Sequence, residues 1–136
     1  MADIATGGGP APAGVTALPS PYGFAETVER LESELKSRGV QVFARIDHAA
    51  NASAVGLVLP PTLVVVFGNA QGGTPLMARA PGLALDLPLR ILVASTPAGV
   101  TVSYHDPVAM AAPYGLTAED VRPLHAVAVI AAAVVA

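Results

Sequence analysis

The 136 residues suffice for one domain that buries most of its apolar surface without cross-links. The chain has no cysteine, which excludes disulfides, thiolate metal sites and a cysteine nucleophile. Lys and Arg number 7 against 10 acidic residues, a net charge of −3, and no basic cluster occurs. We therefore expect no nucleic-acid partner.

The first segment, Met1 to Gly14, is rich in Gly, Ala and Pro and offers nothing to bury. It predicts a disordered leader (1–14) before a single domain over residues 15–136. No basic stretch precedes an apolar core here, so no signal peptide is expected. The longest late apolar run, Ala126 to Ala136, falls short of the roughly 20 residues that a membrane helix needs. We expect a soluble, cytoplasmic protein without a membrane partner.

The first predicted elements are an edge strand at Val15 to Leu18 and a helix at Ala25 to Arg38. The helix has an apolar stripe at steps of four, three and four, and Gly39 suits its left-handed end. Three acid–base pairs at i,i+4 spacing should lie on its solvated face. The stripe is Phe24, Val28, Leu31 and Leu35, and the pairs are Glu26–Arg30, Glu32–Lys36 and Glu34–Arg38.

Two further segments precede the central part of the chain. Val40 to Asp47 alternates in a way that favours a strand with one face on the core. Ala49 to Val55 predicts a short helix. Phe43, like Phe24 and Phe67, is expected in the core.

The run from Leu63 to Phe67 is apolar and β-branched, which is typical of a strand buried on both faces. We expect it in the middle of a sheet. After it, Thr74-Pro75 resembles an N-cap followed by the first residue of a helix through Ala80. Gly72 and Gly73 would then leave backbone amides open to a ligand.

A ligand-binding turn at Asn69, Gly72, Gly73 and Thr74 is therefore one interpretation. The alternative is a tight strand-to-helix connection with nothing bound. Neither a Walker loop nor a Gly-x-Gly-x-x-Gly dinucleotide fingerprint is present.

The later part of the chain predicts a hairpin and further helices. A strand at Leu87 to Ser95 and another at Val100 to Tyr104 flank a turn at 96–99. Asp106-Pro107 should begin a helix, and the segment 117–120 resembles a capping box. From Leu124 onwards the tail is apolar on every side, so it either packs deeply or is covered by a second subunit. On that basis we predict a homodimer.

These elements predict an α+β fold with two layers: a mixed sheet of about five strands, with helices packed mainly on one face. A series of short motifs runs through the chain in a fixed order: Glu26-Thr27-Val28-x-Arg30-Leu31, Gly39, Ile46-Asp47-His48, Phe67-Gly68-Asn69, Gly73-Thr74, Leu76-Met77, Ala84-Leu85-Asp86-Leu87-Pro88 and Tyr104-x-Asp106-Pro107. With these motifs the chain resembles the domain of unknown function 302 family from about Val15 to Tyr114. The family resemblance implies a small two-layer α+β domain, often dimeric, with no established activity. Ala70 departs from the family pattern, where proline is usual, and His105 stands where Asn is common.

Titratable side chains occur at two predicted strand ends, Asp47-His48 and His105-Asp106. If those ends are neighbours, two imidazoles and two carboxylates could perform acid–base chemistry near neutral pH. Alternatively, Asp47 and Asp106 only cap the helices that follow them. No third ligand of fixed spacing supports a metal site, and we expect no cofactor.

Three further residues are candidates for ligand binding. We expect Asp86 to accept hydrogen bonds from the Gly72-Gly73 turn. Arg90 would pair with Asp86 or reach the same turn. Tyr104 is either a hydroxyl donor at a pocket mouth or a core aromatic.

The sequence thus leaves two functional hypotheses open. The first is a small ligand-binding or accessory module for an apolar or anionic ligand near the Asn69–Thr74 turn. The second is a small cofactor-free enzyme that uses Asp47, His48, His105 or Asp106. A purely structural dimer is the remaining case.

Overall fold

The computed structural model of the chain describes residues 11–136. Most of the predicted leader, residues 1–10, lies outside this part. The last leader residues belong to the fold: the Gly14 carbonyl accepts a hydrogen bond from the Asp106 N–H at 2.8 Å, and the Pro12 carbonyl accepts one from the Val15 N–H at 3.0 Å.

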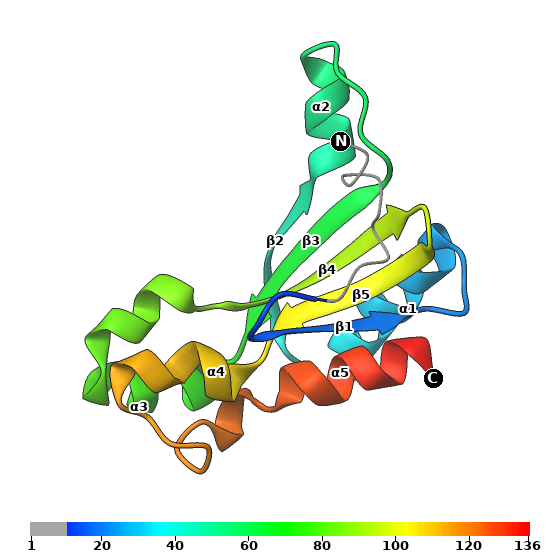
Figure 1. Ribbon diagram of the computed structural model, residues 1–136. Coiled ribbons are helices and arrows are strands. Elements are labelled where there is room, and N and C mark those ends of the chain that lie inside the picture. The colour runs from blue at the N-terminus through cyan, green and yellow to red at the C-terminus, as the bar shows by residue number, and fades with distance from the viewer. Residues whose placement is uncertain (1–10) are drawn as a thin grey trace.

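Five strands form one sheet in the order β1-β5-β4-β3-β2 (Figure 1). The predicted α+β class is confirmed, but the sheet is antiparallel throughout rather than mixed. Strands β2 to β5 are a meander in which each strand lies beside the next, so the direction alternates at every step. The strands are β1 Val15–Pro19, β2 Gln41–Asp47, β3 Thr62–Gly68, β4 Leu89–Thr96 and β5 Gly99–His105.

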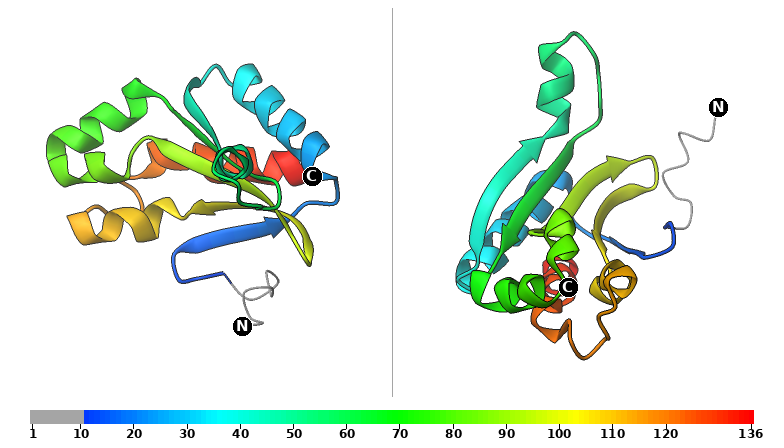
Figure 2. Two further views of the ribbon diagram at one scale, coloured as in Figure 1. Left: turned by 90° about the horizontal axis from the view of Figure 1, so that it is seen from above. Right: turned by 90° about the vertical axis from the view of Figure 1, so that its left-hand side faces the viewer.

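Within residues 11–136, the helices that pack on the sheet cover one of its faces. Figures 1 and 2 show α1 (Phe24–Ser37) and α5 (Ala126–Val135) together on that face. Val65 and Phe67 of β3 point into this core and are fully buried, while Val64 and Val66 are half-buried. The expectation that β3 is buried on both faces is therefore wrong, and β4 is the middle strand.

Helix α1 agrees with the prediction, but its charged side chains are not all a solvated face. Leu31 and Leu35 of the apolar stripe are buried, and so is Thr27. Of the three expected pairs, Glu34–Arg38 is present at 3.2 Å. Glu32 instead binds Arg45 of β2 at 2.6 Å. Because this pair crosses from helix to sheet, it fixes the first helix against the edge strand.

Strands β2 and β3 extend beyond the rest of the sheet and carry α2 (His48–Ala54) at their end, away from the core (Figures 1 and 2). None of the α2 residues is buried, and Val58 beside it is 96% exposed. The expected core position of Phe43 is wrong, since this side chain is 50% exposed. In the alternation of β2, Phe43 lies on the side opposite Val42, which packs against the core, and it is the unpaired residue of the bulge between Val42 and Ala44.

Helix α3 (Ala70–Arg79) begins five residues earlier than the predicted N-cap at Thr74 and first helical residue at Pro75. Asn69 is its N-cap, and its side-chain oxygen accepts a hydrogen bond from the Gln71 N–H at 2.9 Å. Pro75 therefore lies inside the helix, within its first two turns. A short 3₁₀ helix, η2 (Pro81–Asp86), then leads into β4.

The C-terminal segments agree with their local signals. Asp106 caps α4 (Pro107–Ala111), which is followed by η3 (Ala112–Tyr114). Thr117 and Asp120 form the predicted reciprocal capping box at 2.8 and 3.1 Å, before η4 (Arg122–Leu124). The tail packs deeply: Val127, Ile130, Ala131 and Val134 of α5 are buried.

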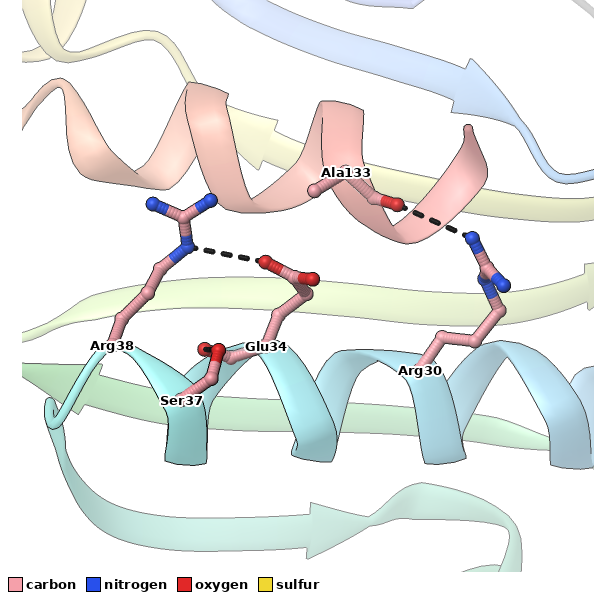
Figure 3. A network of polar contacts seen from close by, with 5 residues as sticks. All are labelled: Arg30, Glu34, Ser37, Arg38 and Ala133. Atoms are coloured by element: carbon pink, nitrogen blue, oxygen red, sulfur yellow. Dashed lines mark hydrogen bonds and ion pairs between the residues drawn. The ribbon is translucent and has the colours of Figure 1, made fainter.

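Arg30 of α1 ties the end of α5 to the first helix (Figure 3). Its guanidinium donates to the carbonyls of Val134 at 2.7 Å, Ala136 at 2.9 Å and Ala133 at 3.4 Å. It also lies 4.2 Å from the centre of the Tyr22 ring. A cation at this place satisfies the free carbonyls of the helix end and complements the helix dipole.

Replacing Arg30 should therefore destabilise the fold more than replacing another arginine of the same helix. We expect Arg30→Met, which keeps the apolar stem, to lower the free energy of unfolding by about 1–2 kcal/mol. Arg38→Met, which removes only a surface pair, should change it by less than about 0.5 kcal/mol. Urea denaturation of the two variants measures the difference. Equal losses would contradict the capping role.

Candidate ligand-binding site

An apolar cavity of about 260 Å³ opens where β3 meets α3. Its walls come from the bulge of β2, the end of β3, the first two turns of α3, the entry to β4 and the segment before α5. We call it the corner pocket. It is lined by Val40, Phe43, Phe67, Gly68, Asn69, Ala70, Gly73, Thr74, Met77, Leu87, Pro88, Leu89, Pro123, Leu124 and Ala126.

Two glycines allow the walls of this pocket to approach each other. A Cβ atom on Gly68 would lie 3.5 Å from the Pro88 Cβ and 3.6 Å from the Phe43 ring. On Gly73 it would lie 3.5 Å from a Leu87 methyl group. The segment before β4 thus contacts the corner through Leu87 and Pro88, and not through Asp86 as the sequence suggested.

The backbone amides of the turn are not available to an anion. The N–H groups of Gly72 and Gly73 both donate to the Asn69 carbonyl at 3.0 Å. Since α3 already begins at Ala70, these glycines are helical and the open turn that the sequence suggested is not formed. Asn69, Gly73 and Thr74 line the pocket, whereas Gly72 faces Pro123. The arrangement suits an apolar ligand better than an anionic one.

The sequence interpretation missed Phe43, Met77, Leu87, Pro88 and Pro123 as pocket residues. Phe43 had a usable signal: it lies on the otherwise polar side of an alternating strand. An aromatic ring at such a position points to contact with something other than the core. The remaining four come from three separate segments, and no local pattern indicates that these segments meet.

The two pairs of candidate acid–base residues are not brought together. Asp47-His48 lies at the junction of β2 and α2, and His105-Asp106 lies at the end of β5, with β3 and β4 between those strands. Asp47 accepts the Ala50 N–H at 2.9 Å, and Asp106 accepts the Ala109 N–H at 3.3 Å. Both carboxylates therefore cap helices, as the structural alternative predicts.

The other predicted ligand-binding residues lie away from the corner pocket. Asp86 accepts a hydrogen bond of 2.7 Å from the Tyr114 hydroxyl, which raises the pKa of Tyr114 above its ordinary value. Arg90 projects from the face of β4 opposite the buried Leu89 and Ile91. Tyr104 is half-buried and packs against the core.

Comparison with known proteins identifies the family. The family model "Domain of unknown function DUF302" matches residues 16–132. The chain belongs to the DUF302 family. Its fold is also that of an uncharacterised conserved DUF302 protein from Bacillus stearothermophilus, with a TM-score of 0.79 at 18% identity over 90% of this chain and 98% of the other.

Curated relatives carry a different name. Two proteins named fluoride-specific ion channel FluC 1, from Brucella suis and Brucella abortus, are 41% identical over 104 residues, 76% of this chain. The match covers 41% and 38% of their lengths, so the chain spans about two fifths of the length of these curated relatives. No helix among residues 11–136 is both long and apolar enough to cross a membrane.

The described residues hold no group of three His, Asp or Glu side chains that could bind a metal ion. The strongest electrostatic feature near the pocket is instead structural. Arg79, at the end of α3, binds Asp120 at 3.0 Å, and Asp120 also accepts the Thr117 N–H at 2.8 Å. These contacts lower the pKa of Asp120 from 3.8 to about 2. They join α3 to the segment that carries Pro123 and Leu124.

This depressed pKa predicts a pH-dependent contribution to stability. The ionised Asp120 should contribute fully above pH 3.8, and the contribution should fall as the pH drops toward about 2. Asp120→Asn keeps an acceptor but loses the charge. Urea denaturation measures the difference in free energy of unfolding between wild type and this variant. That difference should therefore shrink as the pH falls from about 5 to about 2. A difference independent of pH would contradict the assignment.

Proposed function

We propose that the chain binds a small apolar molecule in the corner pocket. The observation that supports this proposal is the pocket itself: about 260 Å³ lined almost wholly by apolar side chains and open at its mouth. For comparison, a closed apolar cavity of about 150 Å³ holds benzene. The corner pocket suits a ligand of roughly the size of indole.

Two substitutions test this proposal: one fills part of the pocket and the other removes part of its wall. Gly73→Ala should narrow the pocket, because the new methyl meets Leu87 at 3.5 Å and Met77 at 3.8 Å. It should also favour α3 by about 0.5–1 kcal/mol. Phe43→Ala should remove an exposed wall with little effect on stability. Indole affinity should fall about five- to tenfold in each variant, since one methyl or a partly exposed ring contributes about 1 kcal/mol.

The Met77 methyl resonance reports binding directly, because Met77 lines the corner pocket and Met110 does not. Indole should shift the Met77 signal to saturation and leave Met110 unchanged. Gly23→Ala is the matched control, because its added Cβ meets nothing within 4 Å. Unchanged indole affinity in both pocket variants, or no shift of Met77, would refute the proposal.

We also propose that the active form is a homodimer that associates through the uncovered face of the sheet. The apolar tail does not support a dimer, because Val127, Ile130, Ala131 and Val134 of α5 are buried within their own chain. The opposite sheet face does: one row across it places Ile46, Val64 and Leu92 side by side. An exposed antiparallel face is normally polar, so this row suits a second apolar surface.

A charge in this row should prevent association. Leu92→Lys on the middle strand should raise the dimer dissociation constant by at least about 100-fold, since an unpaired buried charge costs several kcal/mol. Val108→Lys, on the exposed side of α4, should leave association unchanged. Light scattering coupled to size exclusion measures both. A monomeric wild type would contradict the proposed dimer.

The enzymatic alternative has less support, because its four candidate residues do not share a described cavity and two of them cap helices. We keep the cytoplasm as the expected compartment.

A further inference from the structure

Three further cavities adjoin one another around His105, at the end of β5. We call them together the His105 groove. Arg90 and Asp86 each line two of the three, and Met110 also lines two. One cavity, with a volume of about 170 Å³, is lined by His105, Arg90, Asp86 and Met110 together. Unlike the corner pocket, this cavity presents charged side chains.

Arg90 supplies hydrogen-bond donors that the fold does not use. Within residues 11–136, the arginines at 38, 45 and 79 each contact a carboxylate within 3.2 Å, and Arg90 contacts none. The strand register explains its position: Arg90 pairs with Val66 on one side, and His105 pairs with Val15 on the outer strand. Between β4 and β5, Leu92 pairs with Ser103, so Arg90 and His105 project from the same face of neighbouring strands, and both line one cavity.

Asp86 supplies the opposite chemistry across the cavity. It lies in η2, and the Tyr114 hydroxyl occupies one of its oxygens at 2.7 Å. No Arg90 nitrogen reaches it within ion-pair distance, although both line one cavity. The second carboxylate oxygen can accept a hydrogen bond from a ligand. The cavity thus has donors from Arg90 and His105 and an acceptor from Asp86. Its remaining lining is apolar and comes from Leu85, Leu89, Met110 and Val127.

We propose that the cavity of about 170 Å³ in the His105 groove binds a small carboxylic acid with a hydroxyl or amino group on the carbon next to the carboxylate. The cavity lined by Val64 and Leu92 belongs to the sheet face proposed for association and is not part of this site. The guanidinium of Arg90 holds the carboxylate through paired hydrogen bonds, which match its planar geometry, and the His105 ring supplies one more donor. The free carboxylate oxygen of Asp86 accepts a hydrogen bond from the hydroxyl or ammonium group of the ligand. By comparison with the benzene-sized cavity of about 150 Å³, the volume suits about six heavy atoms, the size of lactate or alanine. This site is independent of the corner pocket.

The experiment titrates the protein with lactate, alanine and propionate and follows the methyl resonances of Met110 and Met77. Lactate and alanine should shift Met110 to saturation and leave Met77 unchanged. Propionate has the carboxylate but no neighbouring hydrogen-bond donor, so its affinity should be lower by about tenfold or more. The Met77 signal separates this outcome from the proposed apolar function, because indole acts there and not at Met110.

Substitutions test the separate roles of Arg90 and Asp86 in binding. Arg90→Gln should abolish saturation, while Arg122→Gln, an exposed arginine far along the chain, should bind lactate as wild type does. Asp86→Asn should reduce the ratio of the propionate to the alanine dissociation constant by about fivefold or more. Thermal unfolding of each variant confirms that the fold persists. The proposal is overturned if Met110 shows no saturating shift up to the solubility limit, or if saturation survives in Arg90→Gln.

Discussion

The architecture depends on the burial of two helices against one face of an antiparallel sheet. Leu31 and Leu35 of α1 and Ile130 and Val134 of α5 have at most 1% of their surface exposed. Apolar surface removed from water is the main favourable term in folding, at about 25 cal/mol per Å². Because α5 has almost no polar side chains, its packing has to be fixed at its ends. Arg30 does this by binding the last carbonyls of the helix.

That packing also produces the corner pocket. For α5 to reach the core face, the chain must return beneath the end of β3, and this places Pro123 and Leu124 opposite the first turns of α3. The bulge at Phe43 supplies the outer wall. The pocket is therefore a consequence of how three connections meet at one end of the sheet. Such a position, where segments from different elements converge, is typical of ligand sites.

Charged groups in this chain serve mostly to fix the ends of elements. Asp47 and Asp106 cap helices, Asp120 closes a capping box and binds Arg79, and Glu32 joins α1 to β2. A carboxylate used in this way has fewer free lone pairs for chemistry. Arg90 and His105 differ because the fold leaves them without such partners among residues 11–136. Their side chains are therefore available to a ligand in the His105 groove.

Local patterns in the sequence determined most elements and several contacts. The stripe of α1, the hairpin at 96–99 and the caps at Asp47, Asp106 and Asp120 all follow from residues within a few positions of each other. Three of the residues that the sequence proposed for ligand binding, Asn69, Gly73 and Thr74, line the corner pocket. These features are predictable because helix periodicity, turn geometry and capping are short-range interactions.

Only the tertiary structure decided the rest. The exposure of Phe43, the earlier start of α3 and the partner of Asp86 depend on segments that are distant along the chain. Phe43 lies near Gly68, 25 residues further on, and Asp86 binds Tyr114, 28 residues further on. Which face of β3 is covered was likewise undetermined, since an apolar run is compatible with one or two covered faces. Long-range packing selects among such alternatives, because each is locally acceptable and differs only in the surface that the whole chain can bury.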